Sequence, residues 1–383
     1  MGGKILFSIF GLILGAVIGY ILVFYTPFLS SHDTSFQYHY QKNVIGFLPY
    51  WLLSSESTTY ANAITMLTYF GLRVDSDGSI LKMQNPQQEE PGWYSLTSGK
   101  VNPFFQNAKK NNISLSLLVA SGNADTITKL IQDPTAHAEK LAQSLSPISK
   151  KYGFSDINID IEYTADATPK MREAFTIFLK TLRAKLPTNQ TLTVDVSTTD
   201  VIKKTLIDVG QVGKIADNIV VMAYDFHAPD SFVNGPVAPL GGAGTSSEYD
   251  VATAMEKTVA MVPSNKVIMG VPLYGYEWEI LGTLPRSAVI PQTGVLASNK
   301  RAEEFLASCS TCSAVLDTDA QEKYISYFSD DTNTNHILFY PDKNSMQKKV
   351  QLANSLGLGG IALWALGYEG NPLLSPLNSY RNQ

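Results

Sequence analysis

Short β-rich runs alternate with longer segments of helical period, and this alternation restricts the fold more than any other feature of the chain. The eight runs are Val44–Trp51, Ile64–Leu72, Ile113–Ser121, Ile157–Tyr163, Leu192–Thr198, Asn218–Phe226, Lys266–Gly275 and Gly359–Gly367. Two of the intervening segments, 133–153 and 345–357, close on a glycine, which commonly caps a helix. Repeated strand-then-helix units form parallel sheets, and eight of them over residues 44–383 predict an α/β fold, a (β/α)8 TIM barrel.

One connection is far longer than the others. Residues 278–345 separate the seventh and eighth runs, whereas a usual βα connection has only about 2–6 residues. The stretch contains KYISYF and HILFYP, two strand-like runs divided by the polar segment SDDTNTN. We therefore expect a small α+β insertion there, on the rim of the barrel.

The beginning of the chain has a different character. Residues 5–29 carry no charge and are predominantly apolar, and a membrane-spanning helix needs about 20 such residues. No clean small-residue cleavage site follows, so we expect an uncleaved anchor at residues 1–31 and a linker at 32–43, with secretion after signal cleavage as the alternative. Lys4 is the only basic residue before the apolar segment, which places the N-terminus in the cytoplasm and the barrel outside it. Three glycines spaced four residues apart would allow weak self-association of two such helices: Gly11, Gly15 and Gly19.

Charge and cysteine content exclude some classes of function. The 383 residues carry a net charge of -5 without a dense Lys/Arg run, so we expect no nucleic-acid partner. Cys309 and Cys312 are the only cysteines, and a zinc site would need two further ligands nearby. We expect a local disulfide or two free thiols there, with a redox role as the alternative, and neither a metal nor a cofactor elsewhere.

The fourth run, INIDIEY, alternates isoleucines with polar residues. Successive side chains of a strand point to opposite faces, so the isoleucines share one face. In a barrel they would pack outward against the helices, and Asn158, Asp160 and Glu162 would point inward. Each step of two residues rises about 6.6 Å, which puts Glu162 uppermost, at the mouth where barrel enzymes place their chemistry. Buried acids are costly unless hydrogen-bonded or functional; a purely structural polar network is the alternative.

This run also carries a family resemblance. FSDINIDIEY resembles the strand-four signature of glycoside hydrolase family 18, the chitinase-like hydrolases, whose pattern is D-G-x-D-x-D-x-E. Four other segments are similar to motifs of that family and follow in its order: ITMLTYFGLRVDSDG, VVMAYDFHAPDSFVNGPVAPL, VIMGVPLYGYEW and GLGGIALWALGYE. The resemblance extends from Val44 to Pro376 and implies a hydrolase of β-1,4 bonds next to N-acetylhexosamines.

The resemblance implies roles for individual residues. Glu162 would be the general acid and then the base toward water, while the substrate's own acetamido oxygen is the nucleophile. Asp160 would hold the acetamido N–H, and Tyr224 would hydrogen-bond the acetamido oxygen. Further substrate-binding residues would be Asn158, Met222, Asp225, Trp364, Trp51 and Tyr274, with Trp364 as the floor on which a sugar face stacks. A packing role in the core is the alternative for the tryptophans.

The chain departs from the family pattern in one residue that matters physically. Asn158 stands where the family has the first aspartate of its D-x-D-x-E core, a form that resembles the spore-cortex, peptidoglycan-directed members. Two stacked aspartates repel, so one of them tends to keep a proton. With an asparagine below it, we expect Asp160 to ionise more readily and its negative charge to favour the protonated form of Glu162.

These features together predict a membrane-tethered, extracytoplasmic hydrolase of N-acetylglucosamine-containing polymers. Peptidoglycan is the preferred substrate because the anchor holds the enzyme near a wall, and chitin is the alternative polymer. A non-catalytic carbohydrate-binding protein is the main alternative function, but such proteins usually lose the acid, and Glu162, Asp160 and Tyr224 are all kept here. A metal-binding barrel would need a His/acid cluster that the sequence lacks.

Overall fold

The computed structural model describes residues 42–54, 59–370 and 372–382. The expected membrane anchor at 1–31 and nearly all of the expected linker at 32–43 lie outside the described residues. In the part that is described, no helix is both long and apolar enough to cross a bilayer. The membrane segment therefore stays a prediction from the sequence.

Eight parallel strands close into a barrel in the order β1–β15–β9–β8–β7–β6–β5–β2, which confirms the predicted barrel. The strands are β1 (Asn43–Pro49), β2 (Met66–Arg73), β5 (Ser114–Ser121), β6 (Asp156–Ile161), β7 (Thr191–Ser197), β8 (Asn218–Met222), β9 (Val267–Pro272) and β15 (Gly360–Trp364). Each of the eight β-rich runs of the sequence supplies one of them. A short hairpin, β3 (Met83–Asn85) and β4 (Gln88–Glu89), extends from the connection after β2.

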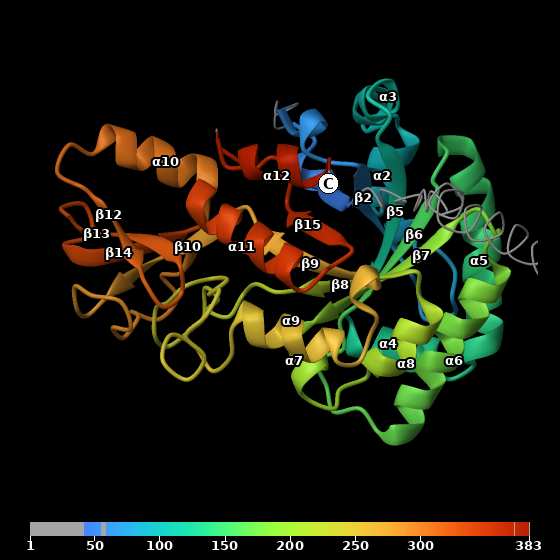
Figure 1. Ribbon diagram of the computed structural model, residues 1–383. Helices are drawn as coiled ribbons and strands as arrows, with labels where there is room; N and C mark the ends of the chain where they lie inside the picture. Colours follow the sequence, from blue (N-terminus) through green and yellow to red (C-terminus); the bar gives the residue numbers. More distant parts are fainter. Residues whose placement is uncertain (1–41, 55–58, 371, 383) are drawn as a thin grey trace, which may run out of the picture. The chain divides into compact units, whose positions relative to one another are not determined.

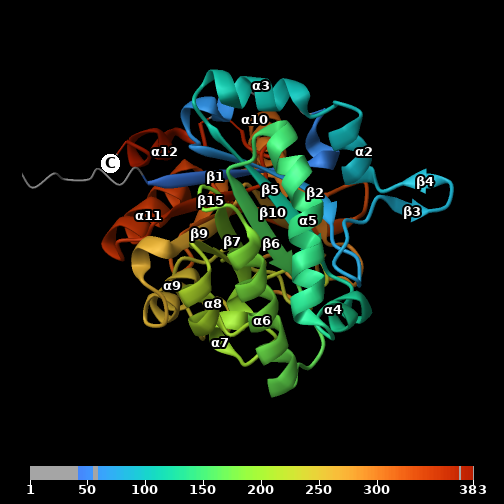
Figure 2. The ribbon, with the colours of Figure 1, turned by 90° about the vertical axis from the view of Figure 1, so that its right-hand side faces the viewer.

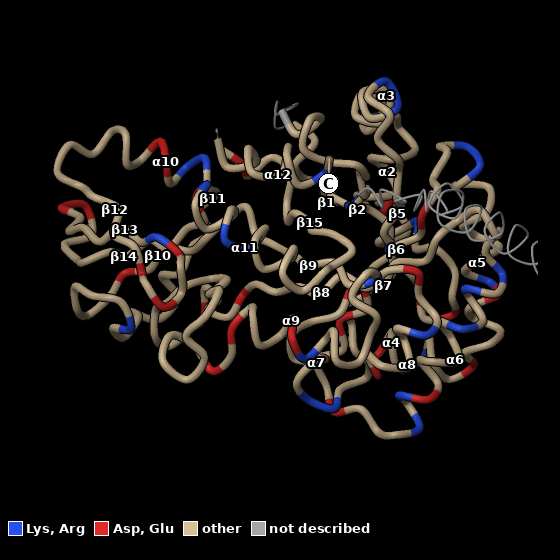
Figure 3. Tube along the Cα trace, in the orientation of Figure 1, with Lys and Arg blue, Asp and Glu red and all other residues tan. Residues whose placement is uncertain are grey.

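Helices surround the barrel (Figures 1 and 2). They are α2 (Pro91–Thr97), α3 (Asn102–Lys110), α4 (Ala124–Leu130), α5 (Pro134–Tyr152), α6 (Pro169–Lys185), α7 (Thr198–Ile202), α8 (Val209–Ile215), α9 (Val251–Val259), α11 (Lys343–Ser355) and α12 (Ser375–Tyr380). In α5, Asp133 caps the N-terminus and Gly153 ends the helix at φ 81°, a left-handed conformation that favours glycine. Many charged residues lie along the helices around the barrel (Figure 3), and the Lys185 side chain of α6 pairs with Glu139 of α5 at 2.8 Å.

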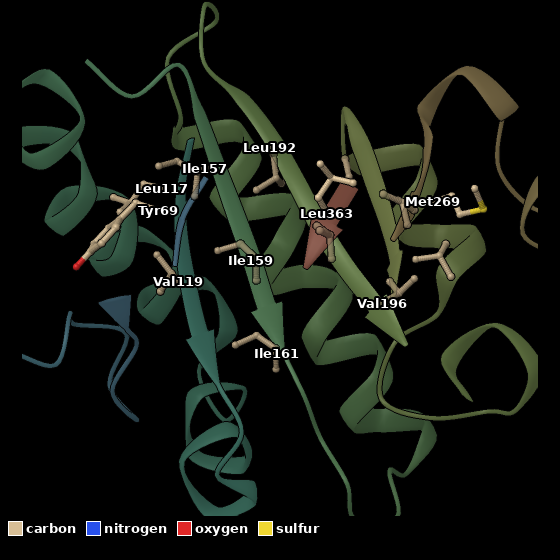
Figure 4. Packing of buried hydrophobic residues seen from close by; sticks show 14 of the residues in the cluster. Tyr69, Leu117, Val119, Ile157, Ile159, Ile161, Leu192, Val196, Met269 and Leu363 are labelled. Carbon is tan, nitrogen blue, oxygen red and sulfur yellow. The ribbon is translucent and has the colours of Figure 1, made fainter. Parts of the chain in front are cut away.

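The isoleucines of β6 face the helices, as the alternation predicts. Figure 4 shows Ile157, Ile159 and Ile161 on one side of the strand, among other buried apolar side chains. They belong to the core cluster that includes Leu141 of α5 and Phe178 of α6. Burial of this face fixes the register of β6, because a shift by one residue would turn the isoleucines inward.

The long connection forms a five-stranded antiparallel sheet with the order β11–β10–β14–β13–β12, on the left in Figure 1. Its elements are β10 (Tyr274–Ile280), β11 (Val295–Ser298), α10 (Asn299–Ser308), β12 (Ala314–Asp317), β13 (Glu322–Ser329) and β14 (Thr334–Tyr340). The expected strands KYISYF and HILFYP are β13 and β14. The inserted sheet begins at Tyr274 rather than at residue 278, because the chain leaves the barrel at Leu273, whose N–H donates to the Trp364 carbonyl at 2.7 Å. A disulfide joins Cys309 and Cys312 just after α10.

One buried acid connects the inserted sheet to the barrel. Glu322, at the start of β13, is fully buried and accepts the N–H groups of Val237 and Ala238, at 2.9 and 3.0 Å. Val237 and Ala238 belong to the long loop that follows β8. Lys349 of α11, itself 1% exposed, opposes the rise that burial causes in the pKa of Glu322.

Candidate active site

The polar residues of β6 line the inside of the barrel. Asn158 is fully buried and Asp160 is 4% exposed, one above the other on the inward face. Glu162 follows directly after the strand, and its N–H still donates to the Ser121 carbonyl of β5 at 2.9 Å. The peptide hydrogen bond holds Glu162 at the carboxyl end of the barrel, where the sequence predicted it.

A cavity of about 370 Å³ opens at this end of the barrel. Its polar wall contains Asp160, Glu162, Asp195, Tyr224 and Asp225, together with Met222. The opposite wall is apolar, formed by Phe47, Phe70, Leu118 and Trp364. The structure thus brings together six of the nine predicted site residues: Glu162, Asp160, Tyr224, Met222, Asp225 and Trp364.

Aromatic rings support the tryptophan of the cavity. Trp364 ends β15, and its ring centroid lies 5.0 Å from that of Phe70 and 5.7 Å from that of Phe47, both edge-on. Trp51 lies 6.3 Å from Trp364 and is 44% exposed, beside the cavity rather than in its wall. Edge-on neighbours hold the indole of Trp364 in place, so that it can serve as a flat stacking surface.

The tyrosine of the site fits because of a glycine on the neighbouring strand. A Cβ on Gly270 of β9 would lie 3.1 Å from the Tyr224 ring and 2.7 Å from the Val221 carbonyl oxygen. Any side chain there would displace the ring or the backbone. Burial and the surrounding acids, Asp195 foremost, raise the pKa of the Tyr224 hydroxyl well above its ordinary value, so Tyr224 remains a hydrogen-bond donor.

Asp225 is positioned by the inserted sheet. It adopts a left-handed backbone, φ 59°, and its carboxylate accepts the hydroxyls of Tyr274 and Tyr276 at 2.6 and 2.9 Å. Tyr274, predicted to bind substrate, is 2% exposed and does not line the cavity. The reason is that the chain turns out of the barrel at Leu273, so the Tyr274 hydroxyl points at Asp225 instead of at the mouth.

The electrostatics of the site differ from the expectation for Asp160. Burial, and then the charge of Glu162, raise the pKa of Asp160 to about 8, and Arg73 opposes the rise. Glu162 is open to the cavity but flanked by protein, so partial desolvation and then Asp225 raise its pKa too. Burial thus opposes the negative charge that we expect on Asp160, whereas the expectation that Asp160 ionises more readily above an asparagine than above an aspartate stays a prediction.

Sequence reasoning missed a second buried acid next to Asp160. Asp195 of β7 is 3% exposed and lines the cavity. Burial, and then Asp160, raise its pKa well above the ordinary value, and the adjacent Asn158 partly offsets that rise. Neither polar atom of the Asn158 amide completes a hydrogen bond of ordinary geometry with the described residues. The alternation of apolar and polar residues in LTVDVST could have indicated it, since Asp195 is at an inward-facing position of that strand.

Asp156 is a third inward acid that the sequence reasoning did not use. It lies at the first position of β6, fully buried, and accepts the hydroxyls of Ser116, Thr191 and Thr193 at 2.6, 2.5 and 2.9 Å. It does not reach the cavity. With three donors and no opening to solvent, Asp156 has the surroundings of a structural acid.

A second hollow, of about 490 Å³, continues the cavity beyond Glu162. It shares Glu162, Asp195, Ser197, Thr199 and Met222 with the first cavity, and Lys203 and Lys204 also line it. Glu162 therefore stands between two connected hollows. Such a groove gives room for sugar units on both sides of one acid. Among the described residues there is no cluster of three or more side chains that could hold a metal ion.

The geometry defines a class of protein: a (β/α)8 barrel with an Asp-x-Glu pair at the end of its fourth strand and a tyrosine and a tryptophan in the same cavity. The chain matches the model of the glycosyl hydrolases family 18 over residues 34–369 and belongs to this family.

Several of the curated relatives are proteins of Bacillus species. The cortical fragment-lytic enzyme of Bacillus cereus is 27% identical over 318 residues, which cover 79% of this chain and 65% of the relative. The putative sporulation-specific glycosylase YdhD of Bacillus subtilis is 30% identical over 261 residues, covering 66% of this chain and 56% of the relative. The match thus spans 65% and 56% of the length of these two relatives. Family and relatives together support a glycosidase.

Solved structures share the fold. The spore cortex-lytic enzyme SleL of Bacillus megaterium has a TM-score of 0.70 at 22% identity, over 89% of this chain and 74% of that chain. A Group IV chitinase of Ostrinia furnacalis, in complex with allosamidin, has a TM-score of 0.76 at 23% identity, over 88% of this chain and 98% of that one.

Proposed function

We propose that the protein is a membrane-tethered glycoside hydrolase that cleaves β-1,4 bonds next to N-acetylglucosamine by a substrate-assisted, retaining mechanism. The observation that carries this proposal is the position of Glu162 between two connected hollows, with Asp160, Tyr224 and Trp364 lining the cavity on one side of it. The remaining argument concerns what each of these groups does.

Glu162 acts as the general acid. Its raised pKa keeps a proton on the carboxyl group in the range where an acid catalyst needs one. The proton passes to the glycosidic oxygen as the bond between that oxygen and the anomeric carbon breaks. The acetamido oxygen of the same sugar forms the new bond to the anomeric carbon. Glu162, now a carboxylate, takes a proton from water, and the water oxygen displaces the acetamido oxygen with net retention.

Asp160 and Tyr224 position the acetamido group. Asp160 accepts the acetamido N–H and, once ionised, stabilises the positive charge that develops on the ring closed by the acetamido oxygen. Tyr224 donates its hydroxyl to the acetamido oxygen and aims it at the anomeric carbon. Fixing both ends of the internal nucleophile lowers the barrier without a protein nucleophile.

The remaining predicted residues contact or support the sugar. Trp364 presents its indole face as the floor, and Met222 and Asp225 line the wall of the same cavity. Trp51, exposed beside Trp364, would contact a neighbouring sugar unit. Asn158 does not line the cavity and supports Asp160 and Asp195 from below.

Peptidoglycan is the substrate we propose. Bacterial relatives of the chain are named for action on the spore cortex, and an open groove on both sides of Glu162 accommodates a polymer. The apolar segment 5–29 would hold the barrel outside the cytoplasm, close to the wall. Self-association through Gly11, Gly15 and Gly19 stays a prediction.

The test compares the wild-type protein with Glu162→Gln on purified peptidoglycan and on chitin oligomers, with reducing ends as the readout. We expect release by the wild type, a rate at least about 10²-fold lower for the variant, and unchanged binding of the glycan by both. Equal binding without release by either protein would instead support a non-catalytic carbohydrate-binding protein. Release from chitin oligomers alone would reject peptidoglycan as the substrate.

A further inference from the structure

Asp195 and Asp160 are lateral neighbours inside the barrel. The pairing of β6 with β7 sets Asn158 opposite Thr193 and Ile159 opposite Val194, so the next inward position sets Asp160 level with Asp195. Adjacent strands lie about 4.8 Å apart. Both acids are nearly buried and both line the cavity.

The groups around this pair are mostly acidic or neutral. The groups that face Asp195 are three acids of the neighbouring segment, one phenol and one amide: Asp156, Asp160, Glu162, Tyr224 and Asn158. Arg73 of β2 acts on Asp160 only. One carboxyl oxygen of Asp160 and one of Asp195 are buried without a hydrogen-bond partner among the described residues. Two adjacent carboxylates in such surroundings cannot both be ionised, so the pair retains a proton.

We propose that Asp195 is a positioning residue that shares one proton with Asp160 and so restores, from β7, the acid pair that Asn158 removes from β6. When Asp160 accepts the acetamido N–H as a carboxylate, its proton is held by Asp195: the O–H bond on Asp160 breaks and an O–H bond on Asp195 forms. The charge of the pair stays the same. Asn158 cannot take this role because an amide does not accept a proton near neutral pH.

The catalytic part of this inference rests on the proposed hydrolase function; the proton pairing does not. A shared proton stabilises the monoanion of the pair, so the first ionisation occurs at lower pH than for one buried acid alone, and the second at higher pH. Asp195→Asn leaves Asp160 as the one remaining acid of the pair. The acidic limb of the kcat/KM profile should therefore move upward by about one pH unit.

The decisive comparison uses Asp195→Asn and the double variant Asn158→Asp/Asp195→Asn, which moves the carboxyl back to β6. We expect the double variant to return the acidic limb to the wild-type position. Asp156→Asn is the matched comparison: it removes another buried acid, which does not reach the cavity and acts on Asp195 less strongly than Asp160 does, so it should move the limb less than Asp195→Asn. An unshifted limb in Asp195→Asn, or a limb that stays shifted in the double variant, would overturn the proposal.

A second readout does not depend on activity. The folded protein holds protons on the pair that the unfolded chain has released, so stability falls as pH rises above the ordinary range of aspartate. Asp195→Asn should flatten the fall of Tm between pH 5 and pH 8.5, and the double variant should restore it. An unchanged slope would refute the shared proton. Absence of hydrolysis by the wild type, with these slopes as expected, would refute the hydrolase and leave the pairing intact.

Discussion

Glu322 is the residue whose loss should most weaken the junction between the inserted sheet and the barrel. It is fully buried, and its two carboxylate oxygens each accept one backbone N–H, from Val237 and Ala238. Both N–H groups lie in a loop with no strand partner for them, so truncation to alanine leaves two buried donors without acceptors. It also removes the larger of the two negative charges that act on the buried ammonium group of Lys349, which has no hydrogen-bond partner among the described residues; Asp342 remains.

The expected cost follows from these contacts. A hydrogen bond to a charged group contributes about 1.5–3 kcal/mol, and Glu322 accepts two of them. We therefore expect Glu322→Ala to lower the free energy of unfolding by about 4 kcal/mol. Glu322→Gln keeps one acceptor and should cost about 2 kcal/mol. Lys349→Met should cost less than Glu322→Ala, because Glu322 retains both N–H donors.

Urea unfolding followed by tryptophan fluorescence measures these differences, since Trp278 is fully buried in the inserted sheet. Glu256→Gln is the control, because Glu256 is an exposed acid of α9 whose side chain has no partner among the described residues; it should change stability by less than about 0.5 kcal/mol. Two results would refute the claim that these two hydrogen bonds stabilise the junction. One is a decrease in the free energy of unfolding below about 1 kcal/mol for Glu322→Ala; the other is a decrease for Lys349→Met as large as that for Glu322→Ala.

Other expectations follow from the same contacts. Tyr276→Phe removes one of two donors to Asp225 and should lower kcat/KM with little change in the urea midpoint, because the Tyr274 hydroxyl remains; an unchanged kcat/KM would show that Asp225 needs only one donor. The wild-type Tm should fall from pH 5 to pH 8.5, because burial raises the pKa of several barrel acids and the folded state must release their protons; a rising Tm would contradict this sign. The Cys309–Cys312 disulfide closes only a very short loop, so its reduction should lower the free energy of unfolding by about 2 kcal/mol at most, measured by urea unfolding with and without reductant.

Local patterns made much of the fold predictable. Each barrel strand is a short run with its own composition, and the glycine that ends α5 is visible in the sequence as Gly153. The period of two in β6 also gave the directions of Asn158, Asp160 and Glu162 without reference to any other segment. Features that depend on one element, such as strand position and facing, are therefore the ones that sequence reasoning recovered.

Features that depend on two elements were missed. Asp195 is next to Asp160 only because β7 pairs with β6 in one particular register, and the helix α6 separates the two strands in sequence. Tyr274 was placed in the cavity because its run continues unbroken from β9, whereas the hydrogen bond from Leu273 to Trp364 ends the barrel strand there. The raised pKa of Asp160 likewise depends first on burial by the whole barrel, which the run INIDIEY alone does not show.

The inserted sheet takes part in the site although none of its residues lines the cavity. A left-handed backbone at a non-glycine residue such as Asp225 costs about 1–3 kcal/mol. Two hydrogen bonds to its carboxylate, from Tyr274 and Tyr276, contribute about 1.5–3 kcal/mol each and outweigh that cost. Both donors lie on β10, and Glu322 on β13 holds the loop that follows Asp225. The segment between the seventh and eighth barrel strands thus determines the geometry after the sixth, so substitutions in it should alter kcat/KM without any contact to the glycan.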